Sequence, residues 1–172
     1  MPDTERSLAS LLTLCADNQA GAIDAQDLRD VIVSALGGYA MVYVVDGATP
    51  QAVTGTAAKL GAFAANGPEA GADGDHTNDQ ITINTTAIYW VDFSTDLVSD
   101  AAGTFVAELR KNGSAEGTLK SECEFEAANE TRSWRFAGPV SLATADVLTV
   151  FVSGTVANLT IKHARLAVKR IG

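Results

Sequence analysis

Hydrophobic and polar residues alternate along most of the chain after residue 38. In the run 87–96, Tyr89, Val91 and Phe93 share one side, while Ile88 and Trp90 begin the other. That second side turns polar after Trp90. A period of two is typical of a strand with one buried face. Because this strand is apolar on both sides at one end, Ile88 and Trp90 are predicted to face a partner subunit.

The same alternation, broken by Gly, Asn and Asp, continues to the end of the chain. It predicts strands at 41–45, 52–54, 59–63, 80–84, 87–96, 103–111, 118–125, 131–137, 147–153 and 160–171. Asn112-Gly113, between two of them, is typical of a two-residue hairpin turn. Regularly spaced strands with turn residues between them indicate an antiparallel sandwich or jelly roll.

Two segments depart from this regular pattern. In the last strand Leu159 and Ile161 lie on one side and Leu166 on the other, so a β-bulge is predicted near 162–164. The segment 64–79 is rich in Gly, Ala and Asp, and we predict a long loop there.

The chain before residue 39 has a helical pattern instead. The apolar residues of 25–36 recur at the spacing of one helix face, and Gly37-Gly38 are typical of a helix end. We therefore divide the chain into an N-terminal helical anchor, 1–38, and a β domain, 39–172. The residues expected to form the anchor are the capping Asp24, Ile23 beside it, and the apolar stripe Leu28, Val31, Ile32 and Leu36.

Composition and charge narrow the possible partners. The chain has 172 residues, 47% of them hydrophobic, which suits one domain with an appendage. Its net charge of −9 argues against nucleic acid, because binding phosphates requires clustered Lys and Arg. No apolar run approaches the roughly 20 residues of a membrane span. The polar first six residues do not resemble a secretory signal.

The two cysteines, Cys15 and Cys123, are far apart in the sequence. We expect two reduced thiols, with a cross-link between chains through Cys15 as the alternative. The glutamates that neighbour Cys123 are expected to raise its pKa.

Catalytic and metal-binding chemistry is sparse. The chain contains no nucleophile-elbow, phosphate-loop or zinc-protease motif, and His76 and His163 are far apart, so no enzyme activity is predicted. The segment from Asp73 to Asp79 offers oxygen ligands of the kind that Ca²⁺ prefers. Its spacing differs from the twelve-residue calcium loop, so we expect a solvated acidic loop, with calcium as the alternative. We expect no other cofactor.

Charged residues cluster by sign on two predicted strands. Glu122, Glu124 and Glu126 alternate with apolar residues on one strand, whereas the last strand is basic. These clusters indicate either solvated surface or electrostatic pairing, between subunits or with the surface of a larger assembly. The basic residues are Lys162, Arg165, Lys169 and Arg170.

Three short motifs resemble those of C1q/TNF-like jelly rolls. Ala87-Ile88-Tyr89 opens a long strand where that family has Gly, an aliphatic residue and Tyr. Leu142 is followed by a turn with Ala145-Asp146 where the family has Gly-Asp, and the chain closes on the strand 166–171. The resemblance covers roughly residues 40–172. It implies an antiparallel jelly-roll sandwich, and the apolar outer side of the strand 87–96, with Ile88 and Trp90, predicts that this domain associates as a homotrimer.

The segment 17–30 resembles a phrase found before such β domains in tailed-bacteriophage virion proteins. It reads DNQAGAIDAQDLRD, and Asp24 occupies a position that is usually Ser or Thr. The resemblance implies a virion structural protein, with the major capsid protein or another virion protein as its partner.

Together these patterns predict a mainly β chain with a short helical anchor. The function they favour is a non-enzymatic, homotrimeric capsid decoration or head-fibre protein on the outer surface of a virion. One alternative is a tail-fibre or receptor-binding tip that recognises a host-surface glycan or protein. Another is a free binding module of the C1q type.

Overall fold

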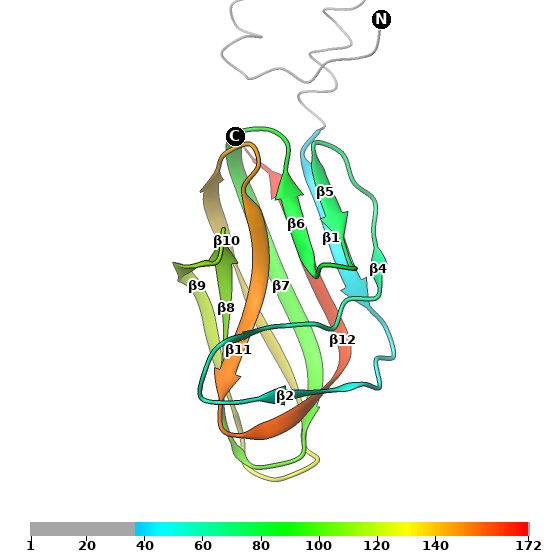
Figure 1. Ribbon diagram of the computed structural model, residues 1–172, viewed down its shortest axis with the longest axis vertical. Helices are drawn as coiled ribbons and strands as arrows, with labels where there is room; N and C mark the ends of the chain where they lie inside the picture. Colours follow the sequence, from blue (N-terminus) through cyan, green and yellow to red (C-terminus); the bar gives the residue numbers. More distant parts are fainter. Residues whose placement is uncertain (1–36, 172) are drawn as a thin grey trace, which may run out of the picture.

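The protein is seen in a computed structural model, which describes residues 37–171. These residues form strands and turns, without a helix among them (Figure 1). The strands are β1 (Tyr39–Val44), β2 (Pro50–Val53), β3 (Ala58–Lys59), β4 (Ala65–Asn66), β5 (Ala72–Asp75), β6 (Gln80–Ile83), β7 (Ala87–Ser99), β8 (Gly103–Lys111), β9 (Ser114–Phe125), β10 (Thr131–Leu142), β11 (Val147–Gly154) and β12 (Ala157–Arg170).

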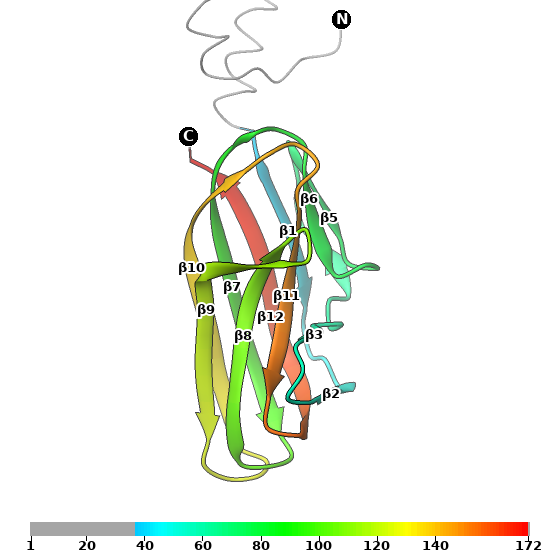
Figure 2. The same ribbon diagram turned by 60° about the vertical axis from the view of Figure 1, so that its left-hand side comes forward.

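The strands form two antiparallel sheets that pack face to face (Figure 2). Sheet A has the order β10-β7-β12-β1-β4, with β2 pairing with β12. Sheet B has the order β5-β6-β11-β8-β9, with β3 pairing with β11. From β7 onward the chain passes repeatedly from one sheet to the other, as in a jelly roll. The predicted fold class is therefore confirmed for the β domain, while the predicted helix lies outside the described residues.

The core lies between the sheets and follows from the alternation of each strand. The side of β7 that carries Tyr89, Val91 and Phe93 is fully buried, as predicted. Phe93 packs on Phe136 of β10 with ring centroids 5.0 Å apart. Burying one such large apolar side chain contributes about 1.5–3 kcal/mol. The strand is therefore held rigidly, and its other side is presented to the outside.

Two local predictions are confirmed. Asn112 and Gly113 form the β8–β9 turn with φ values of 52° and 80°, both in the left-handed region that a type I′ turn requires. The register of β12 against β7 shifts between Ile161 and His163, where the bulge was predicted.

The segment 64–79 is not one long loop, so that prediction was wrong. It contains β4, which pairs with β1, and β5, which forms a hairpin with β6. Its backbone is held by side chains as well, since Glu69 accepts a hydrogen bond from the Gly74 amide at 2.8 Å. Asn66 also donates to the Gly74 carbonyl at 2.6 Å. These side-chain contacts lie within the segment, and its two strands pair with β1 and β6; hydrophobic alternation reveals neither.

Candidate interaction face

Ile88 and Trp90 lie on the outer face of sheet A, the side of β7 opposite the core. Their exposed fractions are 47% and 45%. In the register of the sheet, Trp90 is flanked by Pro139 on β10 and Lys169 on β12. The structure thus places both predicted interface residues side by side on one open surface.

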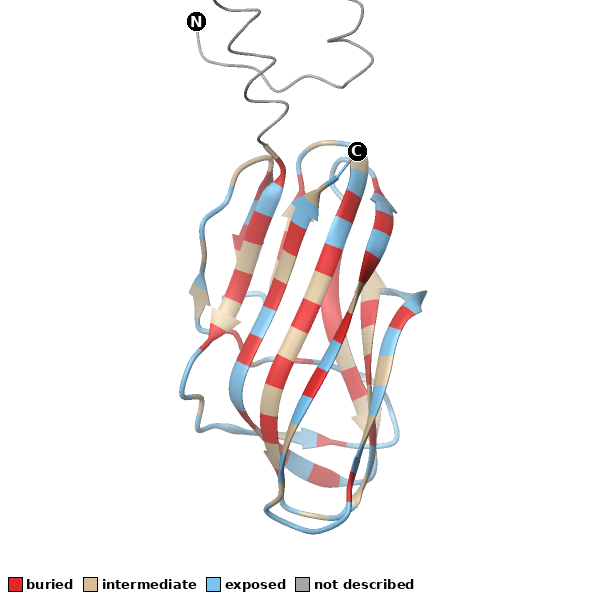
Figure 3. Cartoon of the chain, turned by 180° about the vertical axis from the view of Figure 1, so that it is seen from behind, coloured by how far each residue is buried: buried red, intermediate tan, exposed pale blue. Residues whose placement is uncertain are grey.

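Exposed apolar side chains gather on this face. Six large hydrophobic residues among those described are exposed, and all but Val156 lie on the outer side of sheet A or directly beyond its strand ends. Figure 3 shows the face, with buried and exposed positions alternating along its strands. A concentration of this kind is typical of an interaction surface. The five residues are Tyr39, Val45, Ile88, Trp90 and Ile171.

Three of these five were not predicted from the sequence. Tyr39 begins β1, Val45 follows it, and Ile171 follows β12. Ile171 joins the face because its amide donates a hydrogen bond to the Ile88 carbonyl at 2.8 Å. Residues at strand ends have few neighbours with which to show an alternating pattern. Only Tyr39 could have been placed on the outer side, because it alternates with Met41 and Tyr43 along β1.

The half of the face away from Trp90 is hollowed into a depression of about 560 Å³. One wall is apolar and comes from β1, while β7, β10 and β12 supply polar and charged side chains. In the register, Arg135 and Arg165 flank Ser94 at the same level of the sheet. The apolar wall is formed by Met41, Tyr43 and Val45.

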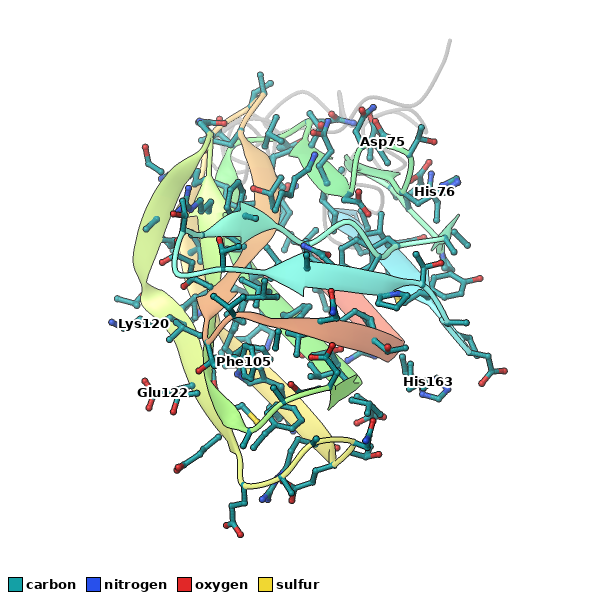
Figure 4. All side chains as sticks on the ribbon, turned by 60° about the horizontal axis from the view of Figure 1, so that its bottom comes forward. Asp75, His76, Phe105, Lys120, Glu122 and His163 are labelled. Carbon is teal, nitrogen blue, oxygen red and sulfur yellow. The ribbon has the colours of Figure 1, made fainter. Side chains whose placement is uncertain are left out.

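Most charges around the depression have partners within the chain. Arg165 donates to Asp92 at 3.0 Å. Asp96 accepts a hydrogen bond from Ser133 at 2.6 Å and lies 3.9 Å from His163. His163, which Figure 4 shows projecting outward, is also 3.5 Å from Asp46. These pairs are largely exposed, so each contributes at most about 1 kcal/mol to stability.

The predicted acidic loop consists of the end of β5 and the β5–β6 turn, and two of its carboxylates accept hydrogen bonds from backbone amides. Asp75 accepts hydrogen bonds from the amide and side chain of Asn78. Asp79 accepts one from the Phe63 amide at 3.0 Å, and burial raises the pKa of Asp79. Among the described residues no group of three His, Cys, Asp or Glu side chains is placed to hold a metal ion.

The anchor residues and Cys15 lie outside the described residues, so their roles stay predictions. Cys123 points to the inner side of β9 and is a free, partly buried thiol. Its pKa is raised, as expected, but burial is the main cause. Arg132 opposes the rise and Glu130 adds to it. Glu122 and Glu124, the sequence neighbours, point to the other side of the strand.

No helix in the range 37–171 has the length and apolar character needed to cross a membrane. No family model matches the chain, and no curated protein matches it.

Solved structures do resemble the chain. The Eiger TNF of S. frugiperda has 12% sequence identity and a TM-score of 0.63, over 78% of this chain and 92% of that one. Murine APRIL has 15% identity and a TM-score of 0.53, over 78% of this chain and 100% of its own. A weaker similarity, at a TM-score of 0.48 and 12% identity, is to the globular domain of zebrafish complement 1qA protein over 78% of this chain and 97% of that one. These comparisons give no indication of a phage origin, which stays a prediction. What the first two establish is the fold: the β domain is a TNF-like jelly roll.

Proposed function

We propose that the chain is a non-enzymatic structural module that forms a homotrimer through the outer face of sheet A. We further propose that it decorates the outer surface of a phage capsid, attached through residues 1–38 to the major capsid protein or another virion protein. The observation that carries the self-association is the gathering of exposed apolar side chains on that one face.

The composition of the face supports a protein partner. Tyr and Trp are enriched at the energetic centres of protein interfaces, where their large rings are removed from water. Trp90 and Tyr39 are 45% and 40% exposed, on strands whose inner sides are packed into the core. A rigid sheet that presents such rings needs little reordering on association, which lowers the entropic loss.

Replacing Trp90 with Asp tests the self-association. We expect Trp90→Asp to yield a folded monomer, because the side chain is outside the core and a buried charge at an interface is strongly unfavourable. The matched control is Val156→Asp, since Val156 is 75% exposed and lies away from the face. Sedimentation velocity and circular dichroism of both variants give the answer. If Trp90→Asp associates as the unmodified chain does, the face is not the interface.

The attachment role rests on the resemblance of 17–30 to the virion phrase and on the predicted apolar stripe of 25–36. Deleting residues 1–36 is the appropriate test, because Gly38 exchanges backbone hydrogen bonds with Ala70 and Arg170 and should be kept. We expect the shortened chain to remain a folded trimer that no longer binds particles of the phage that encodes it. Full decoration of particles by the shortened chain would contradict the anchor assignment.

A tail-fibre or receptor-binding tip remains the alternative. A receptor-binding tip is expected to carry its ligand site on the loops. The depression instead lies on sheet A, next to the apolar half of the same face. Decoration is therefore the function we favour. The location of the protein in intact particles, seen by electron microscopy with a specific antibody, distinguishes capsid surface from tail tip.

A further inference from the structure

The chain contains two Asn-Gly pairs, Asn66-Gly67 and Asn112-Gly113, and pairs of this kind can lose ammonia from the asparagine. The backbone nitrogen of the glycine attacks the side-chain Cγ of the asparagine, and no Cβ on the glycine hinders its approach. A C–N bond forms to give a cyclic succinimide, the attacking nitrogen loses its proton to water, and the side-chain nitrogen leaves as ammonia. Water then opens the ring to aspartate or isoaspartate. The fold decides whether these atoms can meet.

At Asn112-Gly113 the attacking nitrogen is free and the side chain under attack is held. Gly113 is exposed, and its amide donates no hydrogen bond to any residue between 37 and 171. The Asn112 side chain donates to Asp146 at 2.6 Å and accepts from the Val147 amide at 2.8 Å. Both polar atoms on Cγ are therefore engaged, and the side chain cannot rotate without breaking both hydrogen bonds. We call these two contacts the Asn112 clamp.

The Asp146 carboxylate in the clamp is itself fixed in position. Its second oxygen accepts a hydrogen bond from the Ala143 amide at 2.8 Å. This backbone hydrogen bond is the main cause of the lowered pKa of Asp146, and the donation from Asn112 adds to it against the opposing effect of burial. The carboxylate is therefore ionised at neutral pH, and hydrogen bonds to an ionised acceptor are stronger than those between neutral groups.

We propose that Asn112 is a deamidation site that the Asn112 clamp keeps closed in the folded protein. Ammonia is lost only from molecules in which the clamp has opened. The aspartate or isoaspartate formed at position 112 has no side-chain amide to donate, and it places a second carboxylate beside that of Asp146. The clamp cannot form again, so each event irreversibly removes a link between the β8–β9 turn and β11.

The pair Asn66-Gly67 provides a comparison within the same chain. The Gly67 amide donates to the Met41 carbonyl at 2.7 Å, so the attacking nitrogen is engaged as well. The Asn66 side chain donates to the Gly74 carbonyl at 2.6 Å and accepts from the His76 amide at 2.8 Å. None of these contacts involves the β8–β9 turn. Deamidation of Asn66 therefore reports unfolding of the domain, and not opening of the clamp.

Peptide mass spectrometry of the full chain, after incubation at mildly alkaline pH, measures deamidation at Asn112 and Asn66 separately. We expect Asn112 to react about tenfold or more faster in Asp146→Ala than in the unmodified chain, because the rate follows the equilibrium population of the open form. Asn66 is expected to react slowly in both. In concentrated urea both asparagines of the unmodified chain are expected to react rapidly.

Two further variants control for charge and for folding. Glu116→Ala removes a carboxylate from the same hairpin that lies 3.9 Å from Lys111 and takes no part in the clamp. We expect it to change the rate at Asn112 by no more than about twofold, since exposed ion pairs contribute little. Asp146→Asn keeps an oxygen for the Ala143 amide but lacks the charge, and an intermediate rate is expected. This variant decides the matter if Asp146→Ala does not fold.

The proposal is overturned if Asn112 reacts as fast in the folded chain as in urea, or if both substitutions of Asp146 leave its rate unchanged. Equal acceleration of Asn66 and Asn112 in a variant that circular dichroism shows to be folded would also overturn it, because global unfolding would then control the reaction. The clamp lies within one chain, so these outcomes are independent of the proposed trimer.

Discussion

Ala145 adopts a left-handed backbone conformation, with φ of 70°, in the turn between β10 and β11. The conformation is imposed by its surroundings: the Ala145 amide donates to the Ile83 carbonyl, and the Asp146 amide donates to the Ala143 carbonyl. A residue with a Cβ is disfavoured here by about 1–2 kcal/mol, whereas Gly adopts this region freely. This is also where the C1q/TNF-like motif carries Gly.

Replacing Ala145 with Gly should therefore stabilise the domain. The greater flexibility of Gly in the unfolded chain offsets part of the backbone strain that is removed. We therefore expect the free energy of unfolding to rise by about 0.5–1 kcal/mol. Ala145 is exposed, and no packing is lost. Urea denaturation measures the difference, with Ala128→Gly in the exposed β9–β10 turn as the control. A less stable Ala145→Gly variant would show that the turn imposes no strain.

Asp79 is predicted to make stability depend on pH in an unusual direction. Burial raises its pKa above the ordinary 3.8, although the Phe63 amide and Lys59 oppose the shift. A carboxyl group with a raised pKa takes up protons on folding, so its contribution is most favourable below pH 3.8 and is lost as pH rises through the folded pKa.

The variant Asp79→Asn is expected to gain stability at pH 7 relative to the unmodified chain. Its amide oxygen still accepts from the Phe63 amide, and Asn tolerates the φ of 46° at this position. The gain should shrink at pH 3, where Asp79 is protonated. Urea denaturation at both pH values is the measurement. An equal gain at both would mean that ionisation is not the cause.

At the scale of elements, the β8–β9 turn also fastens the start of β11. The Asn112 side chain donates to Asp146 at 2.6 Å and accepts from the Val147 amide at 2.8 Å. The Asn112 amide donates to the Val147 carbonyl at 2.9 Å. Asn112 thus adopts the positive φ that the β8–β9 turn requires and also links the end of β8 to the start of β11.

Replacing Asn112 with Ala should destabilise the domain by about 1–3 kcal/mol, because two side-chain hydrogen bonds are lost and Ala is disfavoured at φ of 52°. Asn112→Gly separates the two effects, since it removes the hydrogen bonds and relieves the backbone. Guanidinium denaturation gives both values. Should Asn112→Ala prove as stable as the unmodified chain, the side-chain contacts contribute nothing.

The long strands could be predicted from the sequence because each alternates clearly. The bounds predicted for the strand 103–111 coincide with β8, and the bulge in β12 follows from the reversal of its parity. The short strands β4 and β5 could not, because Ala65–Asn66 and Ala72–Asp75 carry almost no hydrophobic alternation. They are strands only because β1 and β6 lie beside them.

The candidate face was predictable only in part. Ile88 and Trp90 are visible in one strand as apolar residues on the side opposite the core. Arg135 and Arg165 come together across β10, β7 and β12, which are joined by the topology rather than by the sequence. The depression follows from that arrangement. The pairing order of strands in a jelly roll involves long-range contacts that no local pattern contains.

For the whole molecule, the apolar half of the face and the start of the β domain lie at the same end of the sandwich. Tyr39 pairs with Lys169, and Ile171 hydrogen bonds with Ile88. Residues that precede Gly37 therefore join the domain beside the proposed trimer contact. An assembly through this face would bring three such junctions close together, which suits the proposed attachment through several N-terminal segments at once.

The oligomeric state of the full chain tests the account most directly. Sedimentation equilibrium at micromolar concentration and physiological ionic strength gives the mass without assuming a shape. The account predicts a species of about three times the chain's 17.8 kDa, with dissociation into folded monomers when Trp90 is replaced by Asp. A chain that sediments as a single 17.8 kDa species at these concentrations would contradict it.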